Sequence, residues 1–67
     1  MFTVELTRGQ DHAVVVKTIP LNVPNIGRAI EGARALLDDE GDGADGYLIL
    51  NDSGQSVARN WTGYPHA

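Results

Sequence analysis

The chain has 67 residues, of which 42% are hydrophobic and 21% charged, a formal net charge of −4 at pH 7, and no cysteine. This length allows one small domain with a thin core, and the lack of cysteine excludes stabilisation by disulfides or by a thiolate metal site. Because association is the remaining way to stabilise so small a domain, we expect a homodimer or a higher oligomer.

The negative charge is concentrated in one segment. Five of the nine acids lie within residues 38–45, whereas the rest of the chain carries four acids and five scattered bases. Scattered bases form no patch that would indicate nucleic-acid binding. The chain begins without a signal-peptide pattern, and no run approaches the roughly 20 apolar residues of a membrane-spanning helix. We therefore expect a cytoplasmic protein of a bacterium or phage, with neither nucleic acid nor membrane as a partner.

The first part of the chain predicts a β-hairpin. Residues 2–7 alternate apolar and polar side chains, as a half-buried strand does. A polar turn at 8–11 leads into residues 13–19, which are rich in β-branched side chains on both faces. The second face of the sheet is therefore not expected to be fully solvated. Because Pro20 cannot donate to a sheet ladder, this strand should end at Ile19 or lie at an edge.

Only one segment of the chain has a helical period. Its apolar residues fall within an arc of about 120° on a helical wheel: Ile26, Ala29, Ile30, Ala33, Leu36 and Leu37. Asn22 or Asn25 can serve as the N-cap, and we place the helix at about residues 23–39. Gly41 suits the left-handed position that ends a helix. Gly32, at the border of the apolar arc, allows another backbone to approach closely.

The last part of the chain predicts a second hairpin. Residues 47–50 and 55–61 read as strands, and residues 51–54 have turn chemistry with a glycine in fourth place. Two hairpins flanking one helix give an α+β domain of β-β-α-β-β order. The simplest packing is a four-stranded, mostly antiparallel sheet with the helix on one face, in any of several strand orders. The domain covers residues 1–61, and residues 62–67 form a short C-terminal tail.

The acidic segment is the one candidate for cation binding. Asp38, Glu40 and Asp42, followed by a glycine, have the opening spacing of a calcium loop. Ile49 stands where the loop needs its bidentate glutamate, and a strand follows in place of a second helix. We therefore predict a solvated acidic linker, with a small-ligand or divalent-metal-binding accessory role for the loop 38–45 as the alternative.

Catalytic residues are few and lack their usual setting. A nucleophile, base and acid set can be written only from turn residues: Ser53 or Ser56, His12, and Asp11 or Asp52. No nucleophile elbow or oxyanion loop accompanies them, and a two-layer domain of this size has little room for a water-excluding pocket. His12 is expected to be an exposed turn residue. We predict no enzymatic activity, no catalytic residue and no cofactor.

The aromatic residues of the last third of the chain indicate a partner surface. Tyr47 is expected in the core, whereas Trp61 ends the last strand and Tyr64 lies beyond it, where one helix cannot cover both. Tryptophan and tyrosine are enriched at interface hot spots. Our hypothesis is a self-association or protein-binding surface made of Val15, Trp61 and Tyr64. The chain is thus predicted to be a structural or interaction module.

An opening strand with a polar turn, a helix that ends in ARALLDD, and the closing hairpin GYLILNDSGQSVAR run through the whole chain. In these features it resembles small uncharacterised bacterial domains of β-β-α-β-β layout, a resemblance that implies no activity. Residues 1 to about 40 also resemble HicB-type antitoxins, which run from a strand hairpin through a proline-bearing connector into an Ala/Leu-rich helix. That resemblance implies binding and neutralising a toxin. The chain departs from that family because it lacks its proline-centred core motif and an appended DNA-binding segment.

Overall fold

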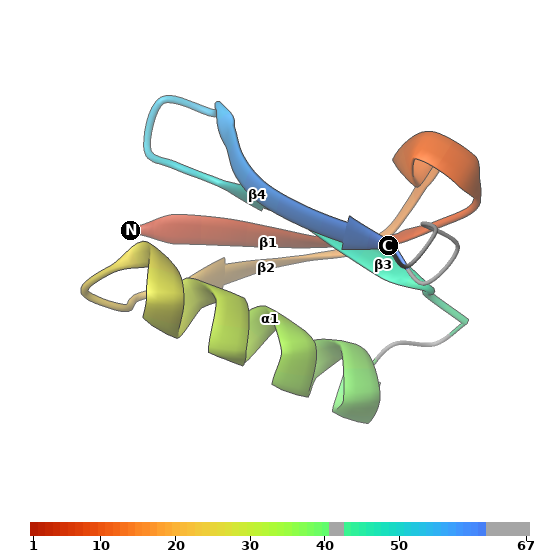
Figure 1. The fold of residues 1–67 in the computed structure, drawn as a ribbon, viewed down its shortest axis with the longest axis horizontal. Coiled ribbons are helices and arrows are strands. Elements are labelled where there is room, and N and C mark those ends of the chain that lie inside the picture. Colours follow the sequence, from red (N-terminus) through yellow and green to blue (C-terminus); the bar gives the residue numbers. More distant parts are fainter. Residues whose placement is uncertain (41–42, 62–67) are drawn as a thin grey trace, which may run out of the picture.

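The computed structural model describes residues 1–40 and 43–61, except the side chain of Glu40. The elements are β1 (Phe2–Arg8), the short 3-10 helix η1 (Gln10–His12), β2 (Val14–Leu21), α1 (Ile26–Glu40), β3 (Gly46–Leu50) and β4 (Ser56–Trp61). Figure 1 shows α1 along one side of the sheet and η1 rising from the other side, at the end of β1. The predicted α+β fold of β-β-α-β-β order is confirmed.

The four described strands form one sheet in the order β2-β1-β3-β4, and each neighbouring pair is antiparallel. The two hairpins therefore join through β1 and β3, which occupy the centre of the sheet. Val4 of β1 lies opposite Ile19 of β2 on one side and opposite Ile49 of β3 on the other. Within the described sheet, β2 and β4 are the edge strands.

The edge position of β2 explains how this strand continues through a proline. It extends to Leu21, two residues beyond Ile19, and Pro20 lies opposite Thr3. An edge strand tolerates proline because its outward side needs no donor for a neighbouring strand. The sequence left two alternatives, a strand that ends at Ile19 or a strand at the edge of the sheet, and the structure has the second.

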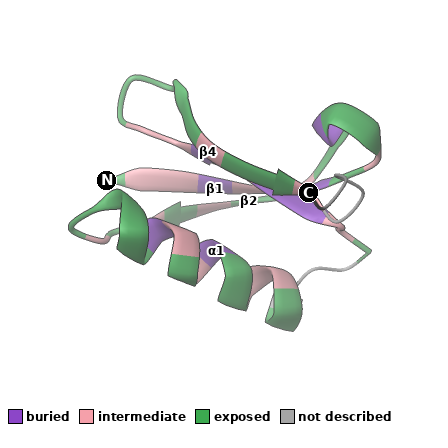
Figure 2. Cartoon of the chain, in the orientation of Figure 1, coloured by how far each residue is buried: buried purple, intermediate pink, exposed green. Residues whose placement is uncertain are grey.

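The core lies between the two central strands and α1. Its buried hydrophobic residues are Val4, Leu6, Ala29, Ala33, Tyr47 and Ile49. In Figure 2 buried residues mark the central strands and the side of α1 that is turned toward them. Tyr47 is only 4% exposed, so its expected place in the core is confirmed. The small residues Ala29 and Ala33 let the helix lie close to the sheet.

The start of α1 is set by Asn25. The backbone N–H of Arg28 donates to Asn25 Oδ1 at 2.9 Å, and the N–H of Ala29 donates to the Asn25 carbonyl at 3.1 Å. Asn25 is therefore the N-cap, and the helix begins at Ile26 instead of near residue 23. Gly41, the residue expected to end the helix, lies outside the described residues.

Gly32 does allow a close approach, but the group that approaches it is a side chain. A Cβ on Gly32 would lie 2.7 Å from Cδ2 of Leu21. The expectation that another backbone would come close at this position is therefore wrong. The reason is that the helix crosses a pleated sheet, whose side chains, and not its backbone, meet the helix surface. This contact also shows that the Gly32 flank of α1 faces β2.

Candidate functional site

The sheet face that is turned away from α1 is the candidate site. Strand alternation and register place on it Thr3, Glu5 and Thr7 of β1, Val15 and Thr18 of β2, Leu48 and Leu50 of β3, and Val57, Arg59 and Trp61 of β4. We call this surface the open face. It mixes apolar and polar side chains, in agreement with the inference from the sequence that the second face is not fully solvated.

One end of the open face is covered by η1 through a buried hydrogen bond. Thr7 Oγ1 and His12 Nδ1 lie 2.7 Å apart, and the two residues are 0% and 9% exposed. His12 is thus not the exposed turn residue that the sequence suggests. The backbone of Asp11 and His12 has φ of 55° and 57°, a left-handed conformation that non-glycine residues rarely adopt. This conformation turns the imidazole ring back onto the sheet.

Asp45 holds the other side of the same turn. Gly9 N donates to Asp45 Oδ1 at 3.2 Å, and Asp45 N donates to the Thr7 carbonyl at 2.9 Å. Gly9 has a φ of 91°, which glycine adopts without steric cost. One member of the acidic segment therefore has a structural role, because it ties the start of β3 to the turn that carries His12.

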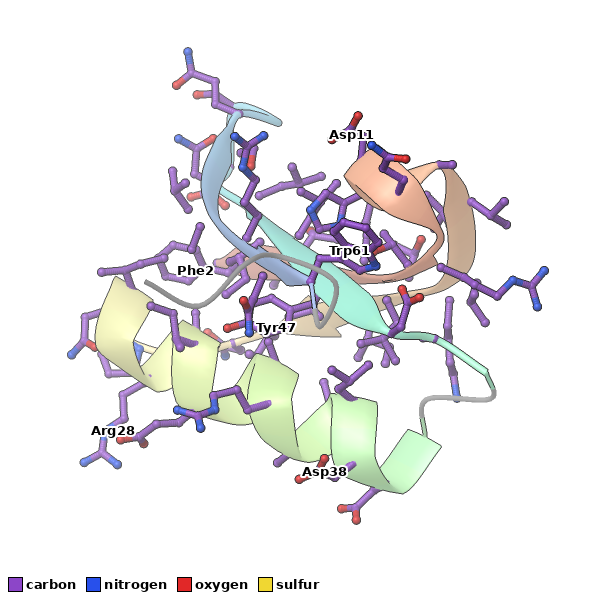
Figure 3. All side chains as sticks on the ribbon, turned by 45° about the vertical axis from the view of Figure 1, so that its right-hand side comes forward. Phe2, Asp11, Arg28, Asp38, Tyr47 and Trp61 are labelled. Atoms are coloured by element: carbon purple, nitrogen blue, oxygen red, sulfur yellow. The ribbon has the colours of Figure 1, made fainter. Side chains whose placement is uncertain are left out.

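The structure places Val15 and Trp61 in one row of the sheet. In the register, Val15 lies opposite Thr7, Thr7 opposite Gly46, and Gly46 opposite Trp61. Val15 is 49% exposed and Trp61 is half-buried. Figure 3 shows Trp61 on the side of the sheet from which η1 rises. Because His12 lies over Thr7 in the middle of this row, Val15 and Trp61 share a face without forming one continuous patch. Tyr64, the third candidate, lies outside the described residues.

Gly46 lets β4 come close to β3 beneath Trp61. A Cβ at this position would lie 2.6 Å from the carbonyl oxygen of Asn60 and 3.1 Å from Cα of Trp61. The distance to the carbonyl oxygen is shorter than a side-chain carbon tolerates, and the distance to Cα of Trp61 is tight. The last row of the open face therefore depends on a glycine in β3.

The middle of the open face is amphipathic. In the register, Glu5 of β1 lies opposite Leu48 of β3, which lies opposite Arg59 of β4. The backbones of Glu5 and Arg59 are thus two strand spacings apart, about 10 Å, with Leu48 between them. Leu48 and Leu50 are partly exposed, and Val57 is 43% exposed. An apolar strip therefore runs over β3 and β4, with opposite charges on its two sides.

The edge strand β4 carries a bulge and a shallow hollow. Ile49 lies opposite Ala58 and Leu50 opposite Ser56, so Val57 is the extra residue of the bulge. A hollow of about 270 Å³ runs along this part of the strand, lined by Ser56, Val57, Ala58 and Arg59. Sequence patterns do not reveal this feature, because a bulge depends on how two strands pair.

The residues of the conceivable catalytic sets are not brought together. His12 lies in η1, at the end of β1 that carries Arg8. Ser53 lies in the β3–β4 turn at the opposite end of the sheet, where the N-terminal amino group of Met1 is 3.2 Å from Asp52. Ser56 begins β4 at that same distant end.

The candidate calcium ligands are only partly described. Asp38 lies in the last turns of α1 and not in a loop, whereas Asp42 and the side chain of Glu40 lie outside the described residues. Among the residues that the structure describes, no group of three His, Cys, Asp or Glu side chains could hold a metal ion.

Comparisons with protein-family models, with curated proteins and with solved structures found no match. Within residues 1–40 and 43–61, no helix has the length and apolar character needed to cross a membrane.

Proposed function

We propose that this chain is a non-enzymatic protein–protein interaction or self-associating module that acts in the cytoplasm. The observation that carries the proposal is the apolar strip on the open face, with Leu48 and Leu50 partly exposed and Val57 43% exposed. In a two-layer fold the helix buries one face of the sheet, and the other face needs a covering layer wherever it is apolar. Apolar side chains grouped on one surface are typical of protein interaction sites.

The distribution of apolar and charged side chains on the open face supports binding over catalysis. Its apolar strip lies on neighbouring strands, and its charged residues, Glu5 and Arg59, lie on opposite sides of Leu48. Interfaces often combine an apolar centre with a charged rim in this way, since the rim gives specificity and the centre gives affinity. A partner protein with a complementary charge pattern fits such a surface.

Sedimentation equilibrium over a micromolar concentration range, with and without millimolar calcium, tests the proposal. We expect a dimer that depends on protein concentration and not on calcium. A monomer at the highest concentration would remove self-association, and affinity capture with the tagged chain would then decide whether another protein binds. For that experiment a toxin is one specific partner to test, because of the resemblance to HicB-type antitoxins. A change in mass caused by calcium alone would favour the acidic segment as a binding site instead.

A further inference from the structure

We propose that η1 is a cap on the open face that opens locally, and that its opening enlarges the surface through which this module associates. The inference rests on the proposed function, to which it adds a means of regulation. In the closed state η1 covers the middle of the row that runs from Val15 over Thr7 to Trp61. When the cap opens, Val15 and Trp61 become the two ends of one continuous surface.

The strands on both sides of η1 are paired without its help, so the cap can open while the sheet stays intact. Arg8, the last residue of β1, pairs with Val14, the first residue of β2. Gly9 N donates to Asp45 Oδ1 at 3.2 Å, which holds the start of the turn against the segment before β3. A Cβ on Gly9 would lie 3.5 Å from Cβ of Ala13, so the two ends of the turn lie side by side. Opening is therefore confined to η1 itself.

The closed cap combines a strained backbone with a hydrogen bond that offsets the strain. Asp11 and His12 have φ of 55° and 57°, and a left-handed residue other than glycine raises the energy of the turn. The bond between Thr7 Oγ1 and His12 Nδ1, at 2.7 Å, acts in the opposite direction. The net contribution of one hydrogen bond is similar in size to the strain of one such residue. These opposing contributions leave the closed state slightly favoured, and strained residues are concentrated in switch regions of proteins for this reason.

Asp11 allows the strain to be changed without altering the core. Its side chain is exposed, and Figure 3 shows it on the outer side of η1, away from the sheet. Asparagine adopts the left-handed conformation more readily than most residues, whereas a β-branched residue such as valine is a steric outlier there. Asp11→Asn should therefore keep the cap closed, and Asp11→Val should open it. Gln10→Val is the matched control, because Gln10 is also exposed and its φ is not positive.

Amide hydrogen exchange measures the opening, because the N–H of His12 donates to the Gly9 carbonyl at 3.2 Å only while the turn is closed. We expect the protection factor of this amide to fall about tenfold in Asp11→Val and to rise about threefold in Asp11→Asn. In Gln10→Val it should stay within about twofold of wild type. The amide of Ile49, in the central strand β3, reports global unfolding, and its protection should change less than that of His12.

Acrylamide quenching of Trp61 gives a second measure of the opening. Trp61 is the only tryptophan of the chain, and it ends β4, a strand that η1 contacts. Quenching should increase in Asp11→Val and decrease in Asp11→Asn. His12→Asn is a second open variant, in case Asp11→Val does not fold, because it removes the bond to Thr7 while asparagine keeps the left-handed preference. Circular dichroism of each variant checks that the fold is retained.

Association of the same variants tests the regulation. Sedimentation equilibrium measures it where the wild type self-associates, and titration with the captured partner measures it where the wild type is monomeric. The open variants Asp11→Val and His12→Asn should associate more tightly than wild type, and Asp11→Asn more weakly. Gln10→Val should match wild type.

The outcomes distinguish the cap from the proposed function. Equal protection of the His12 amide in wild type, Asp11→Val and Asp11→Asn would overturn the cap and leave the interaction module in place. An open cap with unchanged association would overturn its regulatory role and assign the contact to the apolar strip alone. No association of any variant, with protection that still follows the residue at position 11, would overturn the proposed function and the regulation together. Association that strengthens as protection falls across the series supports the inference.

Discussion

Thr7 and His12 are joined by a buried hydrogen bond, with 2.7 Å between Oγ1 and Nδ1, across the turn that connects the first two strands. This bond sets η1 over one end of the open face, in the row that also contains Val15 and Trp61. The hydroxyl of Thr7, on a central strand, therefore helps to hold η1 over one end of the open face.

Replacing Thr7 with valine should destabilise the protein by about 1–3 kcal/mol, because it keeps the shape of the side chain and leaves the buried imidazole without the hydroxyl. Urea unfolding followed by Trp61 fluorescence measures the change. Thr18→Val, at an exposed position on the same face, is the matched control and should stay within about 0.5 kcal/mol of wild type. Equal midpoints for Thr7→Val and wild type would contradict a stabilising role for the Thr7–His12 bond.

Two glycines should respond differently to alanine. A Cβ on Gly46 would overlap the Asn60 carbonyl oxygen at 2.6 Å, and since both groups belong to paired backbones neither can move freely. We expect Gly46→Ala to cost at least about 2 kcal/mol and to loosen the packing around Trp61. Thermal unfolding with near-ultraviolet circular dichroism measures both effects.

Gly32→Ala is the comparison, because there the Cβ would meet only the end of the Leu21 side chain, at 2.7 Å. The leucine can turn away, and alanine raises helix propensity by about 1 kcal/mol. The expected stability is within about 1 kcal/mol of wild type. A larger loss for Gly32→Ala than for Gly46→Ala would be inconsistent with the described packing.

Asn25→Ala should lower stability by about 1 kcal/mol, since it removes the side-chain oxygen that accepts the Arg28 N–H at the start of α1. Asn22→Ala, three positions earlier and exposed, is expected to change stability by less than about 0.5 kcal/mol. Differential scanning calorimetry of the two variants measures both values. If Asn22→Ala were the more costly, the helix would begin earlier in solution than at Ile26.

Two members of the acidic segment should have opposite effects. Asp45→Ala removes the acceptor for Gly9 N and is expected to cost about 1 kcal/mol. Asp39→Asn, exposed near the C-terminal end of α1, should raise the unfolding temperature, since negative charge there opposes the helix dipole. Added salt should reduce the gain from Asp39→Asn because it screens the charge. Losses of equal size in both variants would argue against separate roles for the two carboxylates.

Local patterns in the chain were enough to predict the four strands and α1, but not η1, which lies where the sequence predicts a polar turn. The three- and four-residue spacing of Ala29, Ala33 and their apolar neighbours predicts α1, and the alternation in residues 2–7 predicts β1. These predictions succeed because helix and strand periods depend on residues that are close in sequence. The β-β-α-β-β order and the packing of the helix on one face follow from the same patterns.

The tertiary structure alone decided how these elements meet. The pairing of β1 with β3 joins residues from opposite ends of the chain, such as Val4 and Ile49, and no local pattern encodes that choice. It places β2 and β4 at the edges and so allows Pro20 within a strand. The burial of His12 also depends on it, because this pairing brings β3 and β4 against η1. Sequence alone therefore determined the four strands, the helix and the buried sides of β1 and α1, and long-range pairing determined the surface that remains open to a partner.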